Sequence, residues 1–145
     1  MNYKFASLAG FGIAVLVLII LILRESILAV GFVAIIVQVL AVLLMFWARV
    51  TFGRRSFHAT ADPTEGGLII SGPYHYLRHP IYAAVLYFLW AGILSHLSLW
   101  NVLLGLFATT GLFIRIFAEE RLVTEKYPSY TEYAVRTKRI IPYVL

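Results

Sequence analysis

The sequence contains no cysteine, which excludes disulfide bonds, thiolate metal sites and a cysteine nucleophile. Charged residues are also scarce: they make up 13% of the 145-residue chain, whereas an ordinary soluble domain carries about 25%. Apolar residues account for 61% of the chain, and the mean hydropathy is +0.88. This composition excludes a water-exposed enzyme domain and a disordered chain, and it indicates a membrane protein.

Two long uncharged runs come first in the chain. Phe5–Leu23 has 19 residues and, at about 1.5 Å per residue, reaches roughly 28 Å, close to the thickness of the hydrocarbon core of a bilayer. Ile27–Ala48 is a second run of 22 residues, in which Gln38 is the only strongly polar member. Because only residues 24–26 separate the two runs, the sequence predicts an antiparallel helical hairpin over residues 1–48.

Residues 49–145 are expected to form the core that binds cofactor and substrate, within a single integral membrane domain. Pro80 marks the start of a third helix, since its missing N–H costs nothing in the first helical turn. Ile81–Leu94 is then free of charge, although short for a full crossing. A turn at residues 95–98 leads into a fourth apolar helix, Leu99–Ala118.

The polar segments complete the predicted fold. Residues 49–72 contain charges, a proline and paired glycines, which is typical of a loop. From Glu119 onward the chain is polar and aromatic, which predicts one amphipathic helix broken by Pro128. The expected fold is all-α: a polytopic membrane protein with about four transmembrane helices and a cytosolic, amphipathic C-terminal helix.

The basic residues lie almost entirely on one side of this topology. Of the twelve Lys and Arg residues, eleven precede the first helix, lie between the second and third, or run from Arg115 at the end of the fourth helix onward, and Arg24 alone lies in the first turn. The positive-inside rule therefore places both termini, the long loop and the polar site at the cytosolic face. The net charge of +5 follows from this topology and from contact with anionic lipid. No nucleic-acid partner is expected.

The first polar cluster, residues 71–82, precedes and opens the third helix. His79 occupies the predicted cap position, where the free N–H groups of the helix start would face an anion. Tyr82 follows three residues later, on roughly the same helical face. In the alternative reading His79 is a plain cap and the tyrosines form an interfacial belt. No carboxylate pattern completes a tetrahedral zinc set around His75 and His79, so no metal site is expected.

The second polar cluster, residues 115–121, lies at the end of the fourth apolar run. Arg115 and Glu119 are four residues apart and share a face at the end of a membrane helix. A charge at that depth is usually functional or paired. The alternative is an internal ion pair between Arg115 and Glu119, with Glu120 and Arg121 merely solvated.

An ordered set of motifs runs through the second half of the chain: Ser71-Gly72-Pro73-Tyr74, His79-Pro80-Ile81-Tyr82, Glu119-Glu120, Tyr130-x-x-Tyr133, and a basic segment that ends in Ile141-Pro142. In order and spacing this set resembles the isoprenylcysteine carboxyl methyltransferase and phospholipid methyltransferase family of integral membrane enzymes. The resemblance covers roughly Phe57 to the end of the chain. The first two helices match only as hydrophobic spans.

The resemblance implies an S-adenosylmethionine site at the cytosolic ends of the membrane helices, without a Rossmann fold. The cofactor contacts that it implies fall on Gly67, Leu68, Ile69, Tyr74, His79, Pro80, Ile81, Tyr82 and Glu119. Arg115 matches the family's substrate-facing arginine, and Arg136 matches the basic position after the paired tyrosines. Arg139 is an alternative to Arg136, because the C-terminal alignment shifts by a residue or more.

The chemistry of these residue types agrees with that cofactor. A carboxylate such as Glu119 suits the ammonium of S-adenosylmethionine, and the helix start at His79 suits its carboxylate. Aromatic faces from Tyr74 or Tyr82 suit the adenine or the sulfonium. The sequence therefore predicts a methyltransferase for a lipophilic or membrane-borne acceptor, such as an isoprenylcysteine-like carboxylate, with amine and thiol acceptors left open.

Two other functions fit parts of the pattern. Membrane reductases of the sterol reductase type carry a similar Arg-His-Pro-x-Tyr segment and use NADPH. A non-catalytic helical membrane subunit is the third possibility, and in it Arg115 and Glu119 would form only an ion pair. Binding of one cofactor or the other separates these three hypotheses.

Overall fold

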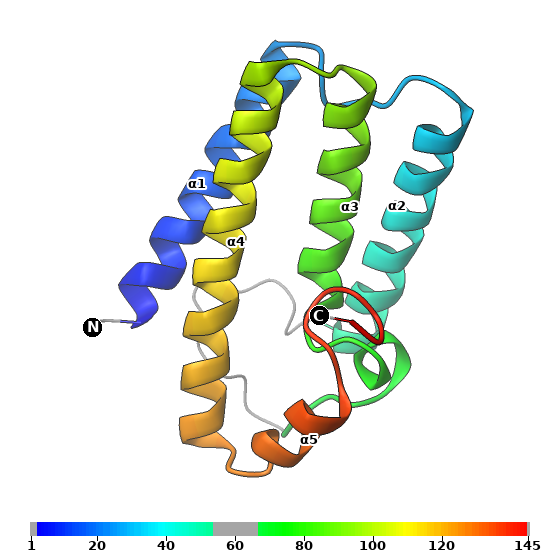
Figure 1. Ribbon diagram of the computed structural model, residues 1–145. Coiled ribbons are helices and arrows are strands. Elements are labelled where there is room, and N and C mark those ends of the chain that lie inside the picture. The colour runs from blue at the N-terminus through cyan, green and yellow to red at the C-terminus, as the bar shows by residue number, and fades with distance from the viewer. Residues whose placement is uncertain (1–2, 54–66, 145) are drawn as a thin grey trace.

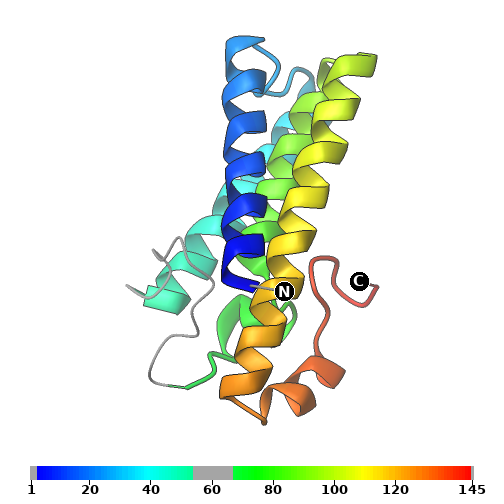
Figure 2. The same ribbon diagram turned by 90° about the vertical axis from the view of Figure 1, so that its left-hand side faces the viewer.

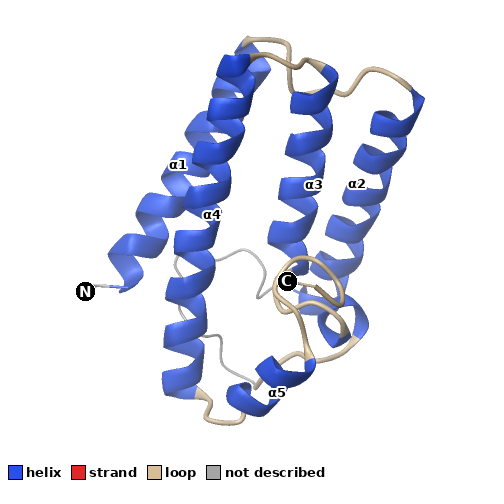
Figure 3. Cartoon of the chain, in the orientation of Figure 1, coloured by secondary structure: helices blue, strands red, loops and turns tan. Residues whose placement is uncertain are grey.

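The computed structural model describes residues 3–53 and 67–144. Its elements are α1 (Tyr3–Leu23), α2 (Phe32–Phe52), the short 3-10 helix η2 (Gly72–His75), α3 (Pro80–Ser95), α4 (Leu99–Lys126) and α5 (Tyr130–Arg136). Helices dominate the part of the chain that is described, and no strand element occurs there (Figure 3). The predicted all-α class is confirmed.

Three of these helices, α1, α2 and α4, are long and apolar enough to cross a membrane. The fourth long helix, α3, has 16 residues, or about 24 Å. It nevertheless runs between the same two ends of the bundle as its neighbours (Figure 1). Large apolar side chains cover the outer faces, including Phe46 and Phe107, which are 68% and 66% exposed. The protein is a polytopic membrane protein with three candidate spans and a shorter α3.

The order in which the helices pack side by side differs from their order in the sequence. α1 packs along α4, α2 packs along α3, and α3 and α4 join the two pairs (Figures 1 and 2). The predicted first hairpin is antiparallel, but α1 and α2 make almost no contact with each other. Each of them packs instead on a helix of the C-terminal half.

Two glycines bring α1 and α4 together. A Cβ atom added to Gly10 would lie 2.3 Å from the carbonyl oxygen of Gly111, and one added to Gly111 would lie 2.8 Å from the carbonyl oxygen of Gly10. The two backbones can approach this closely because neither residue has a side chain, as is common where membrane helices cross. The buried Ser7 and Ala14 extend this face of small residues along α1.

The start of α2 differs from the prediction: it begins at Phe32 and not at Ile27. The side chain of Gln38 explains the difference, because it binds the backbone of the connection that precedes the helix. The N–H of Ala29 donates to Gln38 Oε1 at 2.9 Å, while Gln38 Nε2 donates to the carbonyl of Ile27 at 2.8 Å and to that of Phe88 at 3.0 Å. Gln38 thereby ties α2 to the connection and to α3.

The end of α4 also differs from the prediction. The helix continues past Ala118 to Lys126, so Glu119 lies on the same helix as Arg115. The added residues are mostly good helix formers, and Pro128 disfavours helical conformation just beyond them. The predicted single C-terminal amphipathic helix is therefore wrong in extent: its first part belongs to α4, and only the seven residues of α5 form a separate helix.

One end of the bundle holds the start of α1, the start of α3, and α5 with the segment that follows it (Figure 1). The opposite end holds the connections that follow α1 and α3, where Arg24 Nε donates to Asn101 Oδ1 at 3.1 Å. This arrangement agrees with the alternation predicted from the basic residues. Which end faces the cytosol stays a prediction.

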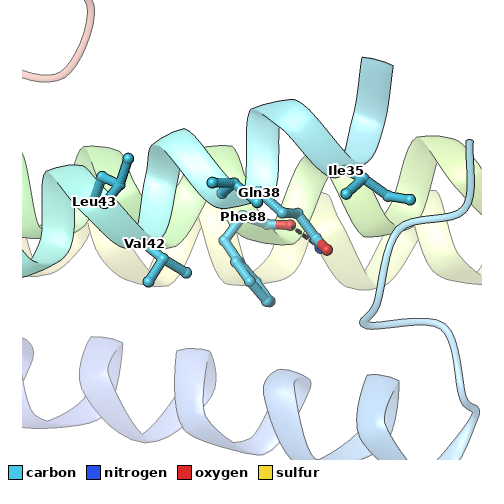
Figure 4. A pocket seen from close by; sticks show the side chains of 6 residues that line it. Ile35, Gln38, Val42, Leu43 and Phe88 are labelled. Atoms are coloured by element: carbon cyan, nitrogen blue, oxygen red, sulfur yellow. Dashed lines mark hydrogen bonds between the residues drawn. The ribbon is translucent and has the colours of Figure 1, made fainter. Parts of the chain in front are cut away.

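An open apolar groove of about 280 Å³ is lined by side chains of α2 and α3 (Figure 4). Its lining residues are Ile35, Gln38, Val39, Val42, Leu43 and Phe88. The amide of Gln38, bonded to the carbonyl of Phe88, is the polar feature of this groove. The groove lies among apolar side chains of α2 and α3, whereas the titratable side chains predicted for the site lie at one end of the bundle.

Candidate active site

The segment after α5 is held beside the residues that lead into α3. The N–H of Arg78 donates to the carbonyl of Lys138 at 2.7 Å, the N–H of His79 donates to that of Arg139 at 3.0 Å, and the N–H of Lys138 donates to that of Tyr76 at 3.2 Å. These bonds form an isolated parallel bridge between two segments about sixty residues apart. They bring side chains from the C-terminal segment to the start of α3 and the polar part of α4.

Arg115, Glu119 and Tyr82 form a closed set of polar contacts. Arg115 Nε lies 3.1 Å from Glu119 Oε1 and donates to the Tyr82 hydroxyl at 2.6 Å. That hydroxyl donates in turn to Glu119 Oε1 at 2.5 Å. The ion pair between Arg115 and Glu119 that the alternative reading expects is present, and Tyr82 of α3 joins it. The side chain of Arg115 is 4% exposed and that of Glu119 is 18% exposed.

His79 lies between the two adjacent carboxylates of α4. Its Nδ1 is 3.8 Å from Glu119 Oε2, and its Nε2 is 3.3 Å from Glu120 Oε1. It occupies the predicted cap position of α3, but its side chain makes no capping hydrogen bond. The ring instead stacks on Tyr82, with 5.7 Å between the centroids. The imidazole therefore hydrogen-bonds Glu120 and lies within ion-pair distance of Glu119.

Glu120 binds two arginines from outside α4. Arg139 makes a two-pronged contact, with Nε at 3.1 Å and Nη2 at 3.0 Å from Glu120 Oε2. Arg78 Nη1 lies 3.2 Å from Glu120 Oε1. Such charge-assisted and bidentate contacts are the stronger class of hydrogen bond. Glu120 therefore fixes the C-terminal segment against the end of α4.

Positive charge exceeds negative charge in this group of residues. Three arginines contact two carboxylates: Arg115 contacts Glu119, and Arg78 and Arg139 contact Glu120. The buried Nε of Arg78 also has no acceptor within the described residues. A buried donor without an acceptor is costly in a folded protein. The site is therefore suited to accept an additional anionic group.

Three tyrosines form the side of the site next to η2 and α5. The Tyr133 hydroxyl donates to the carbonyl of Tyr74 at 2.6 Å, and the rings of Tyr130 and Tyr133 lie 5.7 Å apart. Burial raises the pKa of Tyr133 to about 12. Burial also raises the pKa of Tyr74 and of Tyr130 well above the ordinary tyrosine value. All three hydroxyls therefore stay protonated at ordinary pH.

The structure brings most of the predicted site residues together. His79, Pro80, Ile81 and Tyr82 open α3, opposite Arg115 and Glu119 of α4. Tyr74 is buried in η2, where its carbonyl accepts from the Tyr133 hydroxyl and its ring lies 5.4 Å from that of Phe52. The remaining predicted residues lie in two other places. Gly67, Leu68 and Ile69 lie in the segment that leads into η2, where Gly67 is exposed and the other two are half-buried.

The two basic candidates of the C-terminal segment are in different surroundings. Arg136 is exposed at the end of α5, whereas Arg139 is half-buried and contacts Glu120. The sequence reasoning also left out Arg78 and Glu120 as site residues. Their adjacency to the motif residues His79 and Glu119 was a usable signal, but the contact with Arg139 depends on the path of the C-terminal segment.

The residues present fit the charged groups of S-adenosylmethionine. Glu119 is a partly exposed carboxylate for the ammonium, and the excess of arginine suits the carboxylate of the cofactor. The stacked rings of His79 and Tyr82 lie beside Glu119 and offer an aromatic face for a sulfonium.

The fold and this group of side chains define the class: a polytopic helical membrane protein with a partly buried ionic site at one end. The sequence model of the phospholipid methyltransferase family matches residues 26–130, well over half of the chain, and the protein belongs to that family. It is therefore a membrane methyltransferase. No curated protein and no solved structure matches the chain significantly.

Proposed function

We propose that this protein transfers the methyl group of S-adenosylmethionine to the carboxylate of a lipophilic, isoprenylcysteine-like acceptor at the cytosolic face of the membrane. The observation that carries the proposal is the position of Glu119, whose carboxylate contacts Arg115, Tyr82 and His79 at the polar end of the bundle. The family assignment supports methyl transfer and gives no support to NADPH-dependent reduction.

In this proposal Glu119 binds the ammonium of the cofactor. The start of α3 at His79, together with Arg78, binds its carboxylate, and the Tyr82 ring contacts the sulfonium. When bound, S-adenosylmethionine supplies an activated methyl group, whose bond to sulfur breaks as the bond to the acceptor oxygen forms. The protein contributes alignment and exclusion of water, which together supply on the order of 7–11 kcal/mol where the fit is good.

Arg115 orients the acceptor. Its guanidinium contacts Tyr82 and Glu119, and a planar guanidinium suits recognition of a carboxylate. A carboxylate acceptor has an ordinary pKa of about 4 or below, so it arrives ionised and no general base is needed. Arg139, which is already bound to Glu120, keeps that end of the site closed by the C-terminal segment.

A second candidate acceptor is the amine of a phospholipid, which the description of the matched family favours. An ammonium must lose a proton before its nitrogen can attack the methyl carbon. His79, which lies between Glu119 and Glu120, is the candidate base for that step. This candidate therefore differs from the first in requiring a base.

Calorimetric binding of S-adenosylhomocysteine to the detergent-purified protein tests the cofactor assignment. We expect Glu119→Ala and His79→Ala to lose affinity at least tenfold while remaining folded, and the exposed Glu125→Ala, on the same helix, to bind normally. Unchanged binding in both site variants would remove these assignments. Tight binding of NADPH in place of S-adenosylhomocysteine would favour the reductase hypothesis.

Comparison of two acceptors tests the acceptor class. With N-acetyl-S-farnesylcysteine as the carboxylate acceptor, Arg115→Ala should impair turnover more than it impairs S-adenosylhomocysteine binding. With phosphatidylethanolamine as the acceptor, His79→Ala should be the more damaging change. Methylation of phosphatidylethanolamine alone would select the amine, and equal loss of turnover and cofactor affinity in Arg115→Ala would assign Arg115 to the cofactor.

A further inference from the structure

α1 contributes an aromatic ring to the site. Arg115 Cζ lies 5.0 Å from the centre of the Phe11 ring and 5.7 Å from the centre of the Tyr82 ring. Arg115 itself is 3% exposed. The guanidinium therefore contacts one ring from α1 and one from α3, although it belongs to α4, and a desolvated cation gains most from such contacts.

The crossing of α1 and α4 places Phe11 at this position. Gly10 precedes Phe11 and lies against Gly111, one helical turn before Arg115. A Cβ on Gly10 would also lie 3.3 Å from the backbone nitrogen of Arg115. The close approach of the two backbones therefore fixes the position of Phe11 along the axis of α4. Phe11 is 39% exposed, so its ring lies between the guanidinium and the outside of the bundle.

We propose that Phe11 is a positioning residue: its ring holds the Arg115 guanidinium in one orientation and shields it, so that the guanidinium meets the acceptor at a fixed angle. The proposal rests on the proposed function in one respect, that Arg115 faces the acceptor. α1 lies outside the family match, which begins at residue 26. It follows that α1 is part of the acceptor site as well as a membrane span.

The test compares Phe11→Leu with Phe11→Tyr and with Phe5→Leu. Leucine keeps the apolar volume without the ring, tyrosine keeps the ring, and Phe5, on the same helix, is 72% exposed. We expect Phe11→Leu to raise KM for N-acetyl-S-farnesylcysteine about five- to thirtyfold, as expected for loss of a desolvated cation–π contact. The affinity for S-adenosylhomocysteine should not change. Phe11→Tyr should restore KM, and Phe5→Leu should not alter it.

A second measurement does not depend on turnover. The Nε–Hε resonance of Arg115 in the ¹⁵N-arginine-labelled protein, assigned by its loss in Arg115→Lys, should carry the ring-current shift of Phe11. We expect it to move in Phe11→Leu and to stay in place in Phe5→Leu. If the protein fails to bind S-adenosylhomocysteine, the proposed function fails while this resonance still reports on the contact. An unmoved resonance in Phe11→Leu, or an equal rise of KM in Phe5→Leu, would overturn the positioning role.

Discussion

The hydroxyl of Tyr82 joins α3 to two charged residues of α4. Its hydroxyl accepts a hydrogen bond from Arg115 and donates one to Glu119, so each ion keeps a partner when the other binds a ligand. Buried charges are tolerated only when they are paired or hydrogen-bonded. A ligand that competes for Arg115 or Glu119 would therefore leave neither of them without a partner.

Tyr133 gives a prediction for alkaline pH. Burial raises its folded-state pKa to about 12, above the ordinary value of 10.0, so the stability it contributes is fully present below pH 10 and is lost as pH rises through 12. We expect the thermal unfolding midpoint to fall over this interval, and to fall less in Tyr133→Phe. Circular dichroism on the detergent-solubilised protein measures this. Tyr143→Phe, at a residue that is 85% exposed, should behave like the unmodified protein, and identical pH profiles for all three would contradict the assignment.

Individual contacts within the site were predictable from spacing only where the two partners are close in sequence. The pairing of Arg115 with Glu119 follows from a spacing of four on one helix, and that of His79 with Tyr82 from a spacing of three. The contact of Glu120 with Arg139 depends on the backbone bonds that hold the C-terminal segment beside α3. The sequence did not identify Phe11 as a site residue, since it is one of many apolar residues in a membrane span.

At the scale of elements, the crossing of α1 and α4 depends on Gly10. We expect Gly10→Ala to lower the free energy of unfolding by about 1–3 kcal/mol, because its Cβ would meet the carbonyl oxygen of Gly111 and force the helices apart. Gly12→Ala is the matched control, since its Cβ would meet nothing within 4 Å. Denaturation in mixed micelles measures both variants. Equal stability of the two would show that the helices do not cross at Gly10.

The attachment of α2 to α3 depends on Gln38. Replacing it with leucine removes the hydrogen bonds to the backbone of Ile27, Ala29 and Phe88. We expect a loss of about 1–3 kcal/mol in the free energy of unfolding, because these backbone groups would lose their partner in an apolar setting. Val33→Leu, at a residue that is 73% exposed, serves as the control. A Gln38→Leu variant as stable as this control would show that the amide is dispensable.

Element boundaries were predictable where a local rule fixed them. Pro80 starts α3 as a first-turn proline should, and Ser98 caps α4 by accepting from the N–H of Asn101. The start of α2 differs from the prediction because Gln38 makes long-range hydrogen bonds, and rules based on neighbouring residues do not predict such bonds. The pairing of α1 with α4 could not be predicted either, because the sequence of a span that is apolar on every side does not indicate which face packs against protein.

At the scale of the whole molecule, the membrane topology can be tested directly by cysteine labelling. The sequence has no native cysteine, so only an introduced cysteine can react. We expect single cysteines at Lys138 and at Leu97, both exposed, to react with a membrane-impermeant maleimide from opposite sides of the membrane. The positive-inside rule predicts that Lys138 faces the cytosol, so in intact cells only the cysteine at position 97 should be labelled. Labelling of the cysteine at position 138 in intact cells would reverse the orientation.

The packing of the first two helices on later ones has a consequence for biogenesis. α1 and α2 enter the bilayer before α3 and α4 have been synthesised, and they are not partners in the finished bundle. Insertion and association are separable stages for membrane helices. The early pair must therefore stay apart, or separate again, until α3 and α4 arrive between them, and the ionic site can assemble only after that late step.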